Sequence, residues 1–414
     1  LPGAAVLVEV GPVASGMGSA FAISPDGWWL TARHVVDGCD AVGLVVSRGQ
    51  AVRVLDIKRA EFADILRFWF DAGADGFRID VAHALLKADG LPDLGQQFKP
   101  RVGAPPQQGH PHWDQDGVPD IYREWREVGD SYDPPRVFVA EAWVSSVARL
   151  AEYLRPGRLH TAFDFHTTRC RWDATELRAA ISTSLIAHQA VGAPVTWVLS
   201  NHDINRHVTR YGRGPTSHPL HGRPEDPVDL SLGTRRARAA ILMELALPGA
   251  VYLYQGEELG LPEVDDIPEA MLADPVWERS GRTRRGRDGC RVPLPWSRSG
   301  PSLGFGDGEP WLPQPSNWSS LSVEAEESDR TSMLWLYRDA LRVRRDLPEL
   351  HGDVYSWMES GDDVIALTRG DGFACVVNLG EASIELPAGT VLLSSVPLEG
   401  DRLPTDSAAW ITQA

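Results

Sequence analysis

Lysine is nearly absent from this sequence, and positive charge as a whole is in short supply. Only three of the 414 residues are lysine, so arginine carries nearly all of the positive charge. Acidic residues number 57 against 40 lysines and arginines, which gives a formal net charge of −17. Because such a surface repels both a phosphate backbone and anionic lipid headgroups, we expect neither nucleic acid nor a membrane as a partner.

Cysteine and long apolar runs are also scarce. The four cysteines, Cys39, Cys170, Cys290 and Cys375, are widely spaced and form neither a CxxC pair nor a cluster with histidine at metal spacing. No apolar run is long enough to span a bilayer, and the opening segment LPGAAVLVEV lacks the basic start of a signal peptide. We therefore expect reduced thiols and a cytoplasmic location.

The hydrophobic content, 43% of residues, is sufficient for a packed core, and its pattern changes along the chain. Short runs rich in valine and aromatic residues predict β structure over residues 4–57, with a turn at Pro25-Asp26-Gly27. From Arg59 the apolar residues recur at helical spacing, and Gly73 predicts the end of that helix.

Beyond residue 75, predicted strands and helices alternate. Strands are predicted at 76–80, 136–141, 159–165, 195–200 and 251–255. Helices are predicted at 82–88, 118–128, 147–154, 174–187 and 233–247. This alternation predicts parallel βαβ units. Residues 258–328, rich in proline, glycine and tryptophan, predict a large loop insertion; a helix at 332–345 and short antiparallel strands from 350 follow.

Three predicted strands end in a carboxylate: Asp80, Glu141 and Asp203. In a β/α barrel the chemistry is assembled at these strand ends. Two carboxylates on neighbouring strands can cleave a glycosidic bond, because one attacks or stabilises the anomeric carbon while the other protonates the leaving oxygen. A single acidic residue at a strand end is more often a helix cap or a loop ion pair, so the prediction depends on all three together.

The sequences around these carboxylates resemble a known family. GFRIDV (76–81), VAEAW (139–143) and SNHD (200–203) resemble the second, third and fourth signature regions of the α-amylase superfamily, glycoside hydrolase family 13. HPHWDQDGVPDIYREW, YLYQGEELGLP and GRDGCRVPLPW are similar to its α-glucosidase and oligo-1,6-glucosidase branch. The resemblance covers residues 59–414 and implies a retaining α-glucosidase.

The resemblance also implies a role for each matched residue. Asp80 would be the nucleophile, Glu141 the general acid and then the base, and Asp203 the residue that holds the sugar hydroxyls at the transition state. Three more residues would bind substrate: Arg78 beside the nucleophile, His202 at the sugar hydroxyls and Arg291 at the terminal glucose. Glu141 must be protonated near neutral pH, so its pKa should exceed that of Asp80. A core histidine at 202 and a structural loop arginine at 291 are the open alternatives.

The front of the chain does not fit that family, whose complete members begin with three further βα units. Residues 18–27 and 30–36 instead resemble the start of a bacterial trypsin-like serine protease, with His34 in place of its catalytic base. No matching aspartate or serine follows, so we interpret His34 as non-catalytic. Because the family's calcium loop belongs to the missing units, we predict no metal, and no organic cofactor is implied.

We therefore predict an α/β fold, an incomplete (β/α)8 TIM barrel that lacks its first three βα units. The predicted parts are a trypsin-like β fragment at 1–58, the partial barrel at 59–348 and a C-terminal antiparallel β domain at 349–414. The predicted function is retaining hydrolysis of short α-linked gluco-oligosaccharides, impaired by the missing units. A catalytically inactive chimeric remnant and a serine-protease-like protein are the alternatives. Linkage preference, transfer to another acceptor and oligomeric state stay open.

Overall fold

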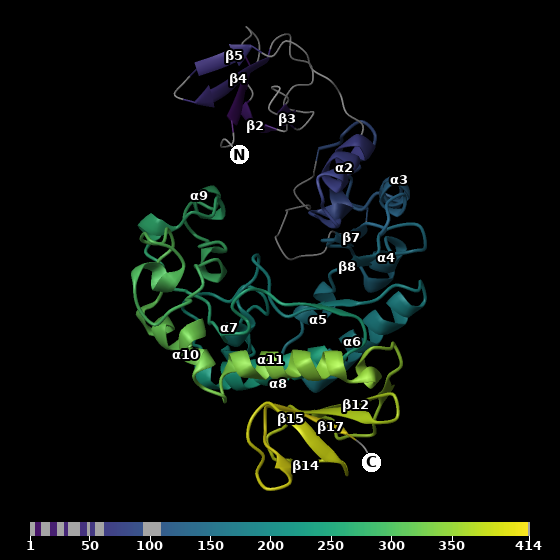
Figure 1. The fold of residues 1–414 in the computed structure, drawn as a ribbon, viewed down its shortest axis with the longest axis vertical. Helices are drawn as coiled ribbons and strands as arrows, with labels where there is room; N and C mark the ends of the chain where they lie inside the picture. Colours follow the sequence, from purple (N-terminus) through teal and green to yellow (C-terminus); the bar gives the residue numbers. More distant parts are fainter. Residues whose placement is uncertain are drawn as a thin grey trace. The chain divides into compact units, whose positions relative to one another are not determined.

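The computed structural model describes residues 62–93 and 109–412 in full and, before them, the backbone of five short strands (Figure 1). By internal contacts the chain divides into two compact units, Leu1–Ala74 and Asp75–Ala414. His34 and the predicted turn at 25–27 lie outside the described residues, so the interpretation of His34 stays a prediction.

The first unit contains an antiparallel sheet and one helix. The sheet has the order β3-β2-β1-β4-β5. Its strands are β1 (Ala5–Glu9), β2 (Met17–Ala22), β3 (Trp29–Thr31), β4 (Val42–Ser47) and β5 (Gln50–Arg53). The prediction of β structure is confirmed for these residues, and β5 is an additional strand. Helix α2 (Phe62–Asp71) ends just before Gly73, whose φ of +101° is a conformation that glycine adopts readily.

The second unit is built on parallel strands that follow one another in sequence order. They are β6 (Gly76–Ile79), β7 (Val137–Ala140), β8 (Thr161–Ala162), β9 (Thr196–Val198) and β10 (Ala250–Tyr252). β6 pairs with β7 and β7 with β8, a parallel bridge between Phe163 and Thr196 continues to β9, and β9 pairs with β10. Gly76 is needed in β6, because a Cβ there would lie 2.2 Å from the carbonyl oxygen of Val137. The predicted βαβ alternation is confirmed.

Helices connect and cover these strands. They are α3 (Val118–Asp130), α4 (Val147–Glu152), α5 (Phe165–Thr168), α6 (Ala174–Gln189), α7 (His207–Gly212), α8 (Leu230–Ala246) and α11 (Met333–Asp346). Figure 1 shows α8 and α11 side by side, between the parallel strands and the C-terminal sheet. Helix α8 contributes many residues to a core cluster that also includes Trp197 of β9 and Trp410. The indole nitrogen of Trp410 donates to the carbonyl of Leu242 at 2.9 Å, so this contact joins α8 to the C-terminal sheet.

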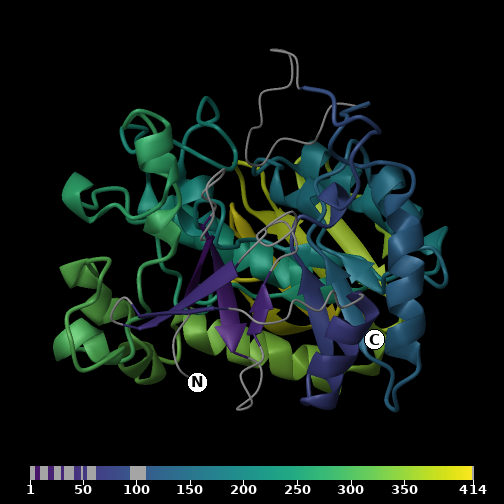
Figure 2. The same cartoon turned by 90° about the horizontal axis from the view of Figure 1, so that it is seen from above.

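The C-terminal part forms an antiparallel sheet with the order β11-β12-β13-β17-β15, beside a small pair β14-β16. The strands are β11 (Ser356–Trp357), β12 (Val364–Arg369), β13 (Phe373–Asn378), β14 (Ile384–Glu385), β15 (Thr390–Ser394), β16 (Arg402–Leu403) and β17 (Ser407–Thr412). Figure 2 shows these yellow strands behind the teal parallel strands. The predicted antiparallel β structure is confirmed, whereas the buried strand β17, which lies between β13 and β15, was not predicted.

The predicted insertion at 258–328 contains short helices around a core of its own. They are η2 (Glu269–Met271), α9 (Val276–Arg279), η3 (Asp288–Cys290), η4 (Pro301–Gly304), η5 (Ser316–Leu321) and α10 (Val323–Glu327), and η6 (Pro348–Leu350) follows α11. Leu259, Leu312 and Trp318 are fully buried within this insertion. The segment is therefore packed, although its composition resembles that of a loop.

One predicted helix, at 82–88, is wrong. The structure has only a single 3-10 turn there, η1 (Ala82–Ala84). The hydroxyl of Tyr122 donates to the carbonyl of Ala82, and the N–H of Ala88 donates to the carbonyl of Pro111. These tertiary partners occupy backbone groups that a continuous helix would pair internally.

Within the part of the chain that the structure describes, no helix combines the length and the apolar character needed to cross a bilayer.

Candidate active site

The three predicted carboxylates follow the carboxyl-terminal ends of the parallel strands. Asp80 comes directly after β6 and Glu141 directly after β7, and these strands are hydrogen-bonded neighbours. The N–H of Ala82 donates to the carbonyl of Glu141 at 2.8 Å, which holds the two strand ends together. Asp203 lies between β9 and α7. Since the strands are parallel, the three residues share one edge of the sheet, where β/α proteins build their sites.

Asp80 has the most exposed carboxylate of the three. Arg78 Nη1 donates to Asp80 Oδ1 at 2.7 Å, which confirms the predicted contact. The side chains are 37% and 70% exposed, so this ion pair stabilises the fold by less than about 1 kcal/mol. Its effect is to orient the Asp80 carboxylate. The Arg78 guanidinium also lies over the ring of Phe163, at 5.9 Å from the centroid.

Glu141 is the buried carboxylate of the site, with only 6% of the residue exposed. Burial raises the pKa of Glu141 and the charge of Asp80 adds to this effect, while the Val81 N–H and the charge of Arg78 oppose it. A pKa above the usual value keeps a proton on a carboxyl group as the pH approaches neutrality, as a general acid requires. The raised pKa of Glu141 has the direction that the sequence analysis expects of this residue.

Val81 connects the two strand ends through its backbone. Its N–H donates to Glu141 Oε2 at 2.7 Å. Its φ and ψ are 46° and 44°, in the left-handed region that a β-branched side chain rarely adopts. Strained conformations of this kind persist where the surrounding structure holds them, often at functional sites. Here the strained backbone places the Val81 N–H within hydrogen-bond distance of the Glu141 carboxyl group.

Asp203 lies between two arginines and a histidine. Its Oδ1 accepts from Arg287 Nη1 at 2.7 Å and from Arg291 Nη2 at 3.0 Å. His202 Nε2 is 3.5 Å from Asp203 Oδ2, and the His202 carbonyl accepts from Arg291 Nε at 2.8 Å. The structure thus brings Asp203, His202 and Arg291 together. The His202 side chain is 46% exposed, so it is not a core histidine.

Arg287 is the residue of this cluster that the sequence analysis did not select. Its Nε donates to Asp274 Oδ2 at 2.6 Å, and its backbone N–H donates to the same oxygen at 2.9 Å. The Asp274 side chain is 0% exposed. Hydrogen bonding to Asp274 is the main cause that raises the pKa of Arg287, followed by that to Asp203. The signal in the sequence was its place in GRDGCRVPLPW, beside Arg291.

The charge of Arg78 acts on Glu141 and also on His202. Its charge lowers the pKa of Glu141 and also that of His202, whose pKa burial lowers most. Across residues 62–93 and 109–412, no group of three His, Cys, Asp or Glu side chains is placed to hold a metal ion.

Comparison with known proteins gives a consistent family. The sequence model described as "Alpha amylase, catalytic domain" matches residues 56–353. A probable alpha-glucosidase of Rhizobium meliloti (strain 1021) is 29% identical over 351 residues, which cover 81% of this chain and 60% of the relative. A probable oligo-1,6-glucosidase 3 of Bacillus subtilis (strain 168) is 25% identical over 314 residues, 68% of this chain and 52% of that protein.

Solved structures agree with this comparison. The alpha-glucosyl transfer enzyme XgtA superposes with a TM-score of 0.69 at 28% identity, covering 85% of this chain and 66% of that one. The trehalose-6-phosphate hydrolase of Bacillus licheniformis, at 21% identity and a TM-score of 0.65, shares the fold. The chain spans about 60% of the length of the Rhizobium relative. Its strand-end carboxylates and the match over residues 56–353 show that the chain belongs to the alpha-amylase family, through the catalytic domain of that family.

Proposed function

We propose that this protein is a retaining α-glucosidase acting on short α-linked gluco-oligosaccharides. The observation that carries the proposal is the pairing of an exposed, arginine-oriented Asp80 with a buried Glu141 at neighbouring strand ends. The names of the relatives, probable alpha-glucosidase and probable oligo-1,6-glucosidase, support the substrate class.

In the proposed reaction the two carboxylates act in turn. Asp80 attacks the anomeric carbon as Glu141 gives its proton to the leaving glycosidic oxygen, so the glycosidic bond breaks and a glucosyl ester forms. Glu141, now ionised, takes a proton from water, which attacks the ester and releases Asp80 with the anomeric configuration retained. Asp203 accepts hydrogen bonds from sugar hydroxyls while Arg287 and Arg291 fix its position.

We propose further that the barrel is incomplete, with the trypsin-like fragment at 1–58, the barrel at 59–348 and the β domain from 349. The 70% exposure of the Asp80 side chain is consistent with a pocket that lacks part of its wall. A catalytically inactive remnant is therefore the second candidate. A serine-protease-like function has only the short resemblance around His34 in its favour.

The test is release of p-nitrophenol from p-nitrophenyl α-glucoside by the full chain. We expect the parent to hydrolyse it, Asp80→Asn to be inactive, and Asp339→Asn on α11 to match the parent. A 5-fluoro-α-glucosyl fluoride should label the parent at Asp80 as a trapped ester, detectable by peptide mass. If the parent neither hydrolyses the substrate nor becomes labelled, while circular dichroism shows a folded α/β protein, the chain is a catalytically inactive remnant.

A further inference from the structure

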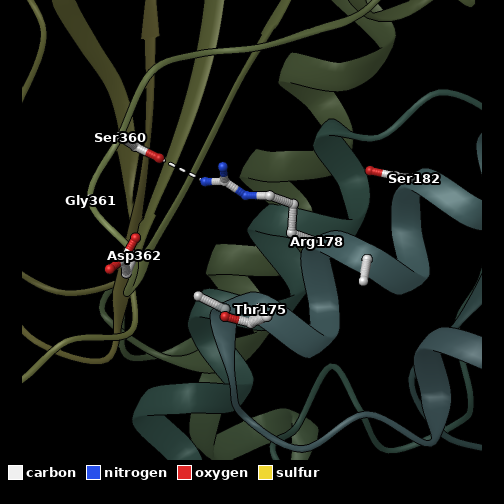
Figure 3. Close-up of a pocket in the computed structure, with 8 residues that line it drawn as sticks. Thr175, Arg178, Ser182, Ser360, Gly361 and Asp362 are labelled. Atoms are coloured by element: carbon white, nitrogen blue, oxygen red, sulfur yellow. Dashed lines mark hydrogen bonds between the residues drawn. The ribbon is translucent and has the colours of Figure 1, made fainter.

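A cavity lined by both polar and apolar groups lies between helix α6 and the C-terminal β sheet. Its volume is about 380 Å³. The lining comes from two places: Ala174, Thr175, Arg178, Ala179 and Ser182 on α6, and Ser360, Gly361 and Asp362 in the turn between β11 and β12 (Figure 3). None of the strand-end residues described above lines it. A volume of this size falls within the range of small-molecule sites, roughly 300–1,000 Å³.

The polar groups of the cavity are held in place by bonds between the helix and the turn. Arg178 Nη2 donates to Ser360 Oγ at 2.7 Å and to the Val364 carbonyl at 2.6 Å, so the guanidinium spans the cavity, as Figure 3 shows. The same guanidinium lies over the ring of Trp357, 5.5 Å from its centroid. The Trp357 indole in turn donates to Ser182 Oγ at 3.0 Å. The lining is thus fixed before any ligand arrives, which lowers the entropy cost of binding.

The chemistry of the lining selects the ligand. Arg178 supplies N–H donors, Asp362 supplies acceptors, and the hydroxyls of Thr175 and Ser182 can do both. The Ser360 hydroxyl already donates to the Val364 carbonyl at 2.8 Å, so toward a ligand it can only accept. One positive and one negative side chain balance, so neither an anion nor a cation is favoured. The methyl groups of Ala174 and Ala179 offer a small apolar surface. A neutral molecule with many hydroxyl groups and C–H faces meets these conditions.

We propose that this cavity is a second saccharide-binding site, separate from the strand-end site and sized for a neutral mono- or disaccharide. It does not depend on turnover at Asp80, since the cavity shares no residue with that site. A saccharide held here would also bridge α6 and the C-terminal sheet, in addition to the Arg178 bonds.

The experiment is saturation-transfer NMR with maltose and with glucose, on the full chain carrying Asp80→Asn and Asp203→Asn so that neither sugar is turned over at the strand-end site. Transfer that arises at the cavity is then identified by its loss in a cavity variant. We expect saturable transfer in this background and binding roughly tenfold weaker after Ala179→Phe, which fills the cavity without removing any of these bonds. Gln189→Phe, at the exposed end of the same helix, is the matched control and should bind as the background does.

Three results would overturn the proposal: no transfer in the background protein, equal binding in Ala179→Phe, or the same loss in Gln189→Phe. Inorganic phosphate that competes with the sugar would also overturn it, because the site would then be an anion site. If Ala179→Phe fails to fold by circular dichroism, Asp362→Ala on the exposed rim takes its place with the same expected weakening. A chain that does not hydrolyse p-nitrophenyl α-glucoside contradicts the proposed function but leaves the cavity proposal unchanged.

Discussion

Asp203 Oδ1 and Arg287 Nη1 lie 2.7 Å apart, although 84 positions separate the two residues in the sequence. Arg287 is itself fixed by Asp274, whose side chain is fully buried. Gly286 permits this approach, because a Cβ there, at a φ of +80°, would lie 2.7 Å from the Asp274 side chain. Arg287 is therefore a positioning residue for Asp203, and Asp274 holds it in place.

Replacing Arg287 tests this relationship. We expect Arg287→Gln to lower kcat/KM for p-nitrophenyl α-glucoside about 10- to 100-fold, the equivalent of one charge-assisted hydrogen bond. Arg279→Gln, an exposed arginine on α9, should leave kcat/KM unchanged. Arg287→Lys keeps the charge without the planar fork and should recover only part of the loss. Parent-like kinetics in Arg287→Gln, with a folded protein, would show that Asp203 does not need this partner.

The pH profile of the enzyme should carry the signature of Glu141. Because burial raises its pKa, the acid form persists above the ordinary carboxyl range, and activity should fall on the alkaline side as Glu141 loses its proton. Glu141→Gln should abolish that alkaline limb and reduce hydrolysis about 10²- to 10⁴-fold. Added azide, which needs no general base, should restore turnover of α-glucosyl fluoride. An alkaline limb that survives in Glu141→Gln would assign it to another group.

The left-handed backbone at Val81 predicts a gain in stability on substitution. Asparagine tolerates this conformation better than a β-branched residue, and the Val81 side chain is 41% exposed, so little packing is lost. We expect Val81→Asn to raise the free energy of unfolding by about 1 kcal/mol, measured by urea denaturation. Val81→Ala keeps most of the conformational cost and serves as the control. If the asparagine variant is less stable than the alanine variant, the left-handed backbone at this position does not carry the conformational cost argued here.

Glu257 predicts a pH-dependent stability. It is 2% exposed, and burial raises its pKa from 4.5 to about 8, against the opposing charges of Arg206 and Arg210. Between these two values the unfolded chain ionises this group while the folded chain keeps it protonated. Its contribution to stability is therefore complete below pH 4.5 and is lost as the pH rises toward 8.

Glu257→Gln removes this group from both states. In denaturant unfolding at a series of pH values, the variant should gain stability relative to the parent as the pH rises through that window, by at most about 1.4 kcal/mol per pH unit. For Glu385→Gln, on an exposed strand, the free energy of unfolding should change with pH as it does in the parent. A constant difference between Glu257→Gln and the parent would mean that Glu257 is ionised in the fold.

The sequence by itself determined the parallel strands and the positions of the three carboxylates. Period and composition predicted β6, β7, β9 and β10, and the flanking motifs identified Asp80, Glu141 and Asp203 at their ends. These signals are local, since each is contained within a few residues of one strand. The Arg78–Asp80 contact is equally local, because two positions separate these residues.

Only the tertiary structure decided how these local pieces meet. The bond from Val81 to Glu141 joins residues 60 positions apart, and the ion pair of Asp203 with Arg287 joins residues 84 apart. The predicted helix at 82–88 does not form, because Tyr122 and Pro111 hydrogen-bond to backbone groups that the helix would pair internally. Burial of Glu141, and with it the shift of its pKa, likewise depends on neighbours that no window of sequence contains. Local pattern sets the strands and their chemistry, whereas long-range packing sets the charges and positions on which catalysis depends.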